Sequence, residues 1–173
     1  RTATDAKERD RLWAGRKGAF GAMGRIAPDL YVADVVVPRT KLKEIVLATT
    51  EICGSRGLKL SNVFHAGDGN LHPNISYDRR DADEVARVLE AGSEIMKVCV
   101  DAGGSLSGEH GIGLEKRDEM HRVFTEADLD AMLRMRAAWD PDERMNPGKA
   151  FPVRGCMEIK TKPFPKTPGG EES

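Results

Sequence analysis

The stretch VFHAGDGNLHPNISY, residues 63–77, constrains the fold of this chain more than any other part of it. Two short runs flank Asp68-Gly69, and Asp-Gly between such runs predicts a two-residue type I′ hairpin turn. With these two residues as the loop, His65 would lie directly opposite His72 on the next strand. We therefore expect a β-hairpin that brings two imidazoles together.

The two faces of the predicted hairpin differ in chemistry. Successive side chains of a strand point to opposite faces, so Val63 and Asn74 would share the face of the two histidines. The opposite face would carry Phe64, Leu71, Pro73 and Ile75. The apolar face can pack on a core, whereas the polar face is a candidate site.

Length, charge and hydropathy exclude several classes of protein. At 173 residues the chain is long enough to bury a core as one domain. Charged residues make up 32% of it, but the net charge is −1, so nucleic acid is not an expected partner. No apolar run has the length of a membrane span, and Cys53 and Cys99 occupy apolar helical positions typical of buried free thiols.

Periodicity and capping residues predict the remaining elements. Helices are expected over 4–23, 40–56, 81–102, 114–123 and 126–139, with Thr4, Thr40, Asp81 and Thr125 at their starts. Strands are expected over 31–37, 59–66, 70–77 and 105–107.

This order predicts an α+β fold. From residue 31 to residue 107 it reads β-α-β-β-α-β, the ferredoxin-like pattern of an antiparallel sheet with helices on one face. Extra helices would precede and follow it. Residues 1–152 would form one domain, and residues 153–173 a loop or disordered tail. The chain starts inside a polar helical pattern without Met, which we interpret as a piece of a longer protein.

A third metal ligand is available in the glycine-flanked pair Glu109-His110. Two histidines and one carboxylate with open coordination positions suit a catalytic divalent metal such as Zn²⁺, Mn²⁺ or Fe²⁺. His110, next to the carboxylate, can take up a proton near neutral pH and is therefore a candidate base.

The residues alone leave several functions open. A metallohydrolase would use metal-bound water as its nucleophile. A metal-assisted oxidoreductase without its electron carrier and a non-catalytic metal-binding module fit equally. Taken singly, Arg16 could be a solvated helix charge, Asn146 part of a turn, and His121 a structural residue.

Three longer motifs resemble the C-terminal domain of FAD-linked oxidases in the vanillyl-alcohol-oxidase class: HAGDGNLHPN, GGSLSGEHGIGLEKR and WDPDERMNPGKAFP. Within that class the sequence is most similar to glycolate oxidase flavoprotein subunits and D-lactate dehydrogenases. The segments LWAGRKGAF and DVVVPR fit the same family. The motifs follow one another in order, with the right gaps, over residues 10–152.

The resemblance implies that this chain is the cap part of an FAD-dependent 2-hydroxy-acid dehydrogenase. A flavin-binding domain elsewhere in the full-length chain would hold most of the FAD, and a small 2-hydroxy acid would be oxidised to the 2-oxo acid by hydride transfer to flavin. The segment alone is expected to be inactive. Other oxidase subunits, including an iron–sulfur subunit, would hold a cytoplasmic protein at the periphery of the inner membrane.

The resemblance also implies roles for single residues. It assigns the metal ligands as His65, His72 and Glu109. His110 matches the base that takes the 2-hydroxyl proton, and Arg16 matches an arginine that binds the substrate carboxylate. Asn74 matches a polar residue of the substrate pocket. Asn146 matches a segment that returns toward the flavin.

Two positions depart from the relatives that oxidise 2-hydroxyglutarate. Those relatives use a hydroxyl residue and a lysine to bind a second carboxylate, and here the positions are Phe20 and Val32. The apolar replacements favour a small monoacid, such as glycolate or D-lactate.

Overall fold

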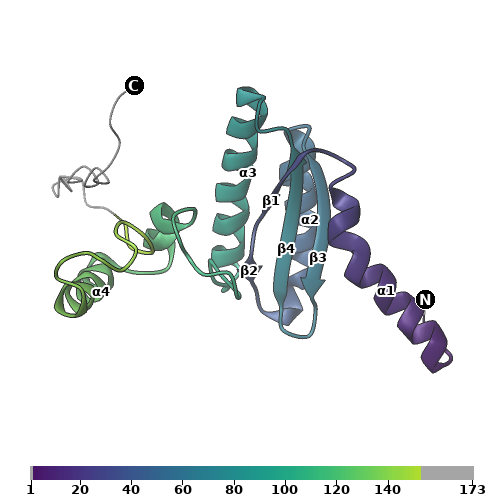
Figure 1. Ribbon diagram of the computed structural model, residues 1–173, viewed down its shortest axis with the longest axis horizontal. Coiled ribbons are helices and arrows are strands. Elements are labelled where there is room, and N and C mark those ends of the chain that lie inside the picture. Colours follow the sequence, from purple (N-terminus) through teal and green to yellow (C-terminus); the bar gives the residue numbers. More distant parts are fainter. Residues whose placement is uncertain (1, 153–173) are drawn as a thin grey trace, which may run out of the picture.

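A computed structural model describes residues 2–152 of the chain. Its centre is an antiparallel sheet with helices packed against it (Figure 1). The elements are α1 Ala6–Met23, β1 Asp29–Val32, β2 Val35–Val36, the 3₁₀ helix η1 Arg39–Lys41, α2 Leu42–Ser55, β3 Lys59–His65, β4 Asn70–Tyr77, α3 Ala82–Asp101, the 3₁₀ helix η2 Arg117–Arg122, and α4 Glu126–Trp139. The α+β class is confirmed. The predicted tail, 153–173, lies outside the described residues.

Strand β4 lies at the centre of the sheet, between β3 on one side and β1 and β2 on the other. Strands β1 and β2 pair with β4 in one register, since Val32 pairs with Asn74 and Val35 with Leu71. They are therefore the single strand expected over 31–37, interrupted at residues 33–34. The interruption lies opposite Pro73, whose oxygen accepts from the Ala33 N–H at 3.0 Å. Because proline has no N–H to return, the ladder is broken there.

The strand expected over 105–107 is reduced to one bridge. Ser105 and Val36 exchange backbone hydrogen bonds of 2.9 and 3.3 Å, and no further pairing follows in the described chain. The bridge still lies at the edge that the ferredoxin-like order requires, beside the strand formed by β1 and β2. The ladder does not continue, because the backbone oxygen of Asp34, the next acceptor along the strand, bonds to Nζ of Lys116. The N–H groups from Gly108 onward bond to the side chain of Asp34.

The predicted two-residue hairpin turn is wrong. His65 pairs with Asn70, and His72 pairs with Val63, so the loop has four residues, 66–69. Only Gly69 in this loop has a positive φ, +74°, and its oxygen accepts from the Val37 N–H at 3.0 Å. The expected and observed registers differ by two residues, which leaves every side chain on the face that the sequence predicts.

The core lies between one sheet face and two helices. Leu71 and Ile75 of β4 and Val35 of β2 are buried against α2 and α3, so the helices do cover a single face. Cys53 and Cys99 are buried free thiols in this layer, as expected. Burial raises the pKa of Cys99 to about 12.

Several predicted helix boundaries need correction. Asp5, not Thr4, caps α1, because its carboxylate accepts the Glu8 N–H. Thr40 lies within η1 and does not cap α2, and the helix expected over 114–123 is only the short η2. Asp81 and Thr125 cap α3 and α4 as expected. Within residues 2–152, no helix combines the length and apolarity that a membrane crossing needs.

Replacing Gly104 by alanine tests the junction between α3 and the bridge. A Cβ atom there would lie 2.0 Å from the Val36 oxygen and 2.7 Å from the Cys99 oxygen, both backbone atoms that cannot move aside cheaply. We expect Gly104→Ala to lower the free energy of unfolding by about 1–3 kcal/mol, measured by urea denaturation. The control is Gly54→Ala in α2, which meets nothing within 4 Å and should raise stability by up to about 1 kcal/mol. Equal effects of the two substitutions would contradict this account of the junction.

Candidate metal centre

The polar sheet face brings two histidines together from adjacent strands. His65 ends β3 and His72 lies within β4, on a diagonal of the ladder instead of directly opposite. Their ring centroids are 5.5 Å apart, and the rings are nearly perpendicular. His65 is exposed, whereas His72 is buried. The prediction that the hairpin places both imidazoles on one face therefore holds despite the changed register.

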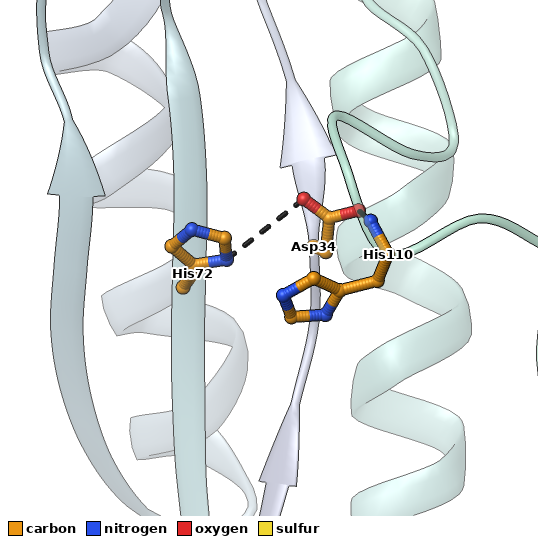
Figure 2. Close-up of side chains that lie close together, drawn as sticks. All are labelled: Asp34, His72 and His110. Atoms are coloured by element: carbon orange, nitrogen blue, oxygen red, sulfur yellow. Dashed lines mark hydrogen bonds and ion pairs between the residues drawn. The ribbon is translucent and has the colours of Figure 1, made fainter. Parts of the chain in front are cut away.

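A loop after the bridge, residues 107–111, supplies the other two functional side chains. The Nε2 atom of His72 lies 3.3 Å from Oε1 of Glu109. The ring of His110 stacks on that of His72, with centroids 5.1 Å apart. Figure 2 shows His110 and His72 side by side, with Asp34 beside both. The bend that places Glu109 and His110 at one site is aided by Gly111, which has a φ of +83°.

The geometry of His65, His72 and Glu109 fits a divalent metal. One ligand atom from each residue lies within 4.8 Å of the others. Two ligands of a tetrahedral zinc ion are about 3.3–3.5 Å apart, which matches the separation of His72 and Glu109. Burial lowers the pKa of His72, which favours the neutral imidazole that a metal requires.

A second group of possible ligands is Asp34, His72 and His110. Here Asp34 is the less suitable ligand, because both of its oxygens already accept hydrogen bonds, Oδ1 from the Glu109 N–H at 3.3 Å. Its Oδ2 accepts from the Ser107 hydroxyl at 2.7 Å and from the His110 N–H at 2.8 Å, and the Gly108 and Glu109 N–H groups add two more bonds of 3.0 Å. We therefore take the first group as the metal centre.

Asp34 itself was missed by the sequence reasoning, which treated 31–37 as a β-branched strand. The sequence did carry a signal, namely a single carboxylate within an otherwise apolar strand. Folding buries such a carboxylate only when it is paired with donors or a positive charge. Burial alone would raise the pKa of Asp34, but the Ser107 hydroxyl, the loop N–H groups and the nearby Lys116 ammonium together hold that pKa below its ordinary value.

Lys116 is the buried cation that accompanies this carboxylate. Its Nζ lies 3.6 Å from Oδ2 of Asp34 and donates to the backbone oxygens of Asp34 and Leu106. Burial lowers the pKa of Lys116, and the charge of Asp34 opposes that shift. Sequence reasoning quoted Lys116 in a motif but gave it no role.

The side of β4 that carries His72 also carries polar atoms without partners. Within the described residues, four buried side-chain nitrogen or oxygen atoms have no hydrogen-bond partner: Asn70 Oδ1, His72 Nδ1, Asn74 Oδ1 and Ser76 Oγ. The amide nitrogen of Asn74 donates to the His72 oxygen at 2.7 Å, which leaves its oxygen available. Buried polar atoms without partners are rare, so this row is typical of a site that binds water or a ligand.

An open cavity of about 370 Å³ adjoins the cluster. Its lining comprises Val32, Lys149 and the segment from His110 to Lys116. An imidazole, an apolar wall and an exposed cation therefore border one space large enough for a small organic acid.

The structure does not bring Arg16 or Asn146 to the cluster. Helix α1 projects away from the sheet (Figure 1), and no hydrogen bond or ion pair joins Arg16 to another residue of the range 2–152. Asn146 lies exposed in the loop after α4, where its backbone oxygen accepts a hydrogen bond from the Arg136 guanidinium at 2.8 Å. The roles suggested for these two residues remain predictions.

Comparison with known proteins matches residues 1–150 to the family described as FAD linked oxidases, C-terminal domain. The chain is 46% identical over 160 residues to glycolate oxidase subunit GlcD of Escherichia coli K12, which covers 92% of this chain and 32% of the relative. The subunit of the same name from Bacillus subtilis is 36% identical over 150 residues, covering 87% and 32%. The mitochondrial D-lactate dehydrogenase (cytochrome) of Kluyveromyces lactis is 35% identical over 157 residues, covering 87% and 27%. The chain thus spans about a third of the length of these curated relatives.

Replacing His72 by alanine tests the metal centre, and His121 provides a matched control. His121 is exposed, and its Nδ1 bonds to the Asp118 oxygen, outside the cluster. We expect the full-length protein to bind one Zn²⁺ at this centre, and His72→Ala to weaken that binding by at least about tenfold, because one of three ligands is lost. His121→Ala should bind Zn²⁺ like the unmodified protein in calorimetric titration. Retained affinity in His72→Ala would show that the cluster is not the binding site.

Proposed function

The chain belongs to the family of C-terminal domains of FAD-linked oxidases, and from this premise we propose that it is the metal- and substrate-binding part of a 2-hydroxy-acid dehydrogenase. The family match confirms the resemblance drawn from the sequence motifs. The observation that carries the proposal is the convergence of four side chains from two separate segments, His65, His72, Glu109 and His110. One of them, His110, also lines an open cavity.

His65, His72 and Glu109 would hold a divalent cation of the kind that Zn²⁺, Mn²⁺ and Fe²⁺ represent. Bound there, the cation would lower the pKa of a substrate hydroxyl. The neutral imidazole of His72 and the carboxylate of Glu109 need no rearrangement for this role, because their ligand atoms already lie 3.3 Å apart.

His110 is proposed to remove the hydroxyl proton of the substrate. Its ring borders the cavity and is held against His72 by stacking, while about half of its side chain stays exposed. FAD, when bound, would supply the acceptor for the hydride of C2 of the substrate. The hydroxyl proton then passes to an imidazole nitrogen of His110, and the C2–O bond becomes the carbonyl of the 2-oxo acid.

The cavity supports a small monoacid as the substrate. Val32 lines it and lies opposite Asn74 in the sheet. The relatives that oxidise 2-hydroxyglutarate have at this position the lysine that helps to bind a second carboxylate. Lys149, bordering the same cavity, can attract the single carboxylate of a glycolate-like or lactate-like acid. Arg16 is proposed to complete that contact in the full-length protein, and Asn74 to contact the substrate.

The remaining parts of the proposal concern partners. We propose that a flavin-binding domain of the same full-length chain binds most of the FAD, and that Asn146 approaches the flavin. Two of the relatives are named as oxidase subunits, which supports an assembly with other subunits. We further propose that an iron–sulfur subunit is among them and that the assembly lies in the cytoplasm, at the periphery of the inner membrane.

Flavin reduction tests the proposed function directly. The segment alone should bind no FAD tightly and oxidise nothing, whereas co-expression with the flavin-binding part should give a yellow protein that glycolate or D-lactate bleaches. Absence of bleaching by any small 2-hydroxy acid would overturn the proposal. Ester or amide hydrolysis by the metal-loaded segment would favour a metallohydrolase instead.

Substitutions of two adjacent residues test the division of roles within the site. Glu109→Gln removes a charged ligand, so both the metal content and the rate of flavin reduction should fall. His110→Ala should keep its metal and lower the rate of flavin reduction by about 10²–10⁴, the usual contribution of a general base. Metal analysis and stopped-flow flavin absorbance measure the two quantities. Loss of metal in His110→Ala, or a near-normal rate, would show that His110 is not the base.

A further inference from the structure

The metal centre is built from two segments that no strand pairing joins. His65 and His72 belong to the hairpin of β3 and β4, whereas Glu109 and His110 lie beyond the bridge at Ser105. Some other interaction must therefore hold the two ligand-bearing segments in register.

One oxygen of Asp34 holds the loop. Its Oδ2 receives the hydroxyl of Ser107 and three successive backbone N–H groups, those of Gly108, Glu109 and His110. Successive N–H groups that converge on one anion form a nest, and the conformation of a nest depends on that anion. The Ser107 oxygen also accepts the Gly111 N–H at 2.8 Å, which closes the loop around the carboxylate.

The other oxygen of Asp34 accepts the Glu109 N–H at 3.3 Å and also faces the hairpin. Its Oδ1 lies 3.8 Å from Nδ1 of His72, and this nitrogen is buried and has no hydrogen-bond partner within the described residues (Figure 2). On the opposite side of the same ring, Nε2 faces Glu109 at 3.3 Å. A histidine that binds a metal through one nitrogen usually directs its other N–H at a carboxylate, which sets the tautomer and the ring orientation.

We propose that Asp34 is the positioning residue of this metal centre: one oxygen shapes the loop that carries Glu109 and His110, and the other orients His72. The inference rests on the proposed metal centre. It assigns Asp34 no contact with the metal or the substrate, since its action passes through the residues that it holds.

The chemistry of the site explains why this residue is an aspartate. Oδ2 faces N–H and O–H donors of the loop, and Oδ1 faces the Glu109 N–H and Nδ1 of His72, which would carry the proton when Nε2 binds a metal. Asparagine carries only one acceptor, so its NH₂ group would point at one set of these donors. Lys116, with Nζ 3.6 Å from Oδ2, supplies the positive charge that accompanies the buried carboxylate.

The test is Asp34→Asn in the full-length protein, with Zn²⁺ and Co²⁺ as probes. We expect the dissociation constant for Zn²⁺ to rise by about 10–100-fold, the usual effect of losing a carboxylate that orients a metal-binding histidine. The visible absorption of the Co²⁺-loaded variant should also differ from that of the unmodified protein, because the ligand geometry changes. Both readouts are independent of turnover.

A matched control separates positioning from general stability. Asp140 is likewise a buried carboxylate that accepts two backbone N–H groups, those of Arg144 and Met145, in a loop outside the cluster. Asp140→Asn should lower the thermal unfolding temperature as Asp34→Asn does, yet leave the Zn²⁺ affinity and the Co²⁺ spectrum unchanged. A folded Asp34→Asn protein with unmodified metal affinity and spectrum would overturn the inference.

A second variant decides the matter if Asp34→Asn does not fold. Ser107→Ala keeps the carboxylate and its partner Lys116 but removes two of the bonds that hold the loop, those of the Ser107 hydroxyl to Asp34 and to the Gly111 N–H. Zn²⁺ binding should therefore weaken by about 3–10-fold. Unchanged affinity in Ser107→Ala would then overturn the inference. If the unmodified protein itself binds neither Zn²⁺ nor Co²⁺, the proposed metal centre fails, and this inference fails with it.

Discussion

The structure of the site depends on one buried carboxylate, that of Asp34. Its side chain is completely enclosed, and it accepts hydrogen bonds from a loop more than 70 residues later in the chain. An isolated buried charge would be costly, and here the cost is offset by four donors and the ammonium of Lys116. Because three of those donors are backbone N–H groups of the loop with Glu109 and His110, the same interaction that stabilises the charge places the proposed ligand and the proposed base.

The hydrogen-bond ladder of the sheet is interrupted beside Asp34 by a proline in the neighbouring strand β4. Pro73 lies in the central strand, where its missing N–H divides the neighbouring strand into β1 and β2 at Ala33 and Asp34. The gap in the ladder and the buried carboxylate therefore occur at the same place. A proline in a central strand is tolerated here, and Asp34, one of the two residues of the gap, carries the side chain that organises the loop.

Much of the site could be predicted, and the errors have identifiable causes. The alternation of side chains along a strand placed His65 and His72 on one face, and that result survived a wrong turn because the register error was two residues. The turn was misjudged because Gly69 packs against Val37, a contact that an Asp-Gly pair does not reveal. The expected last strand shrank to the Ser105 bridge because Lys116 bonds to the backbone oxygen of Asp34 that the next ladder bond would use.

The sequence by itself determined the helix periodicities, the chemistry of the two hairpin faces, the glycine-flanked Glu109-His110 pair and the family. These depend on neighbouring residues and on motifs that remain contiguous in the chain. Only the tertiary structure decided that Asp34 joins the hairpin to the loop and that Lys116 accompanies it. The reason is physical: the donors lie 73–82 positions from Asp34 in the sequence, so their approach to it depends on strand pairing and core packing, not on any local pattern.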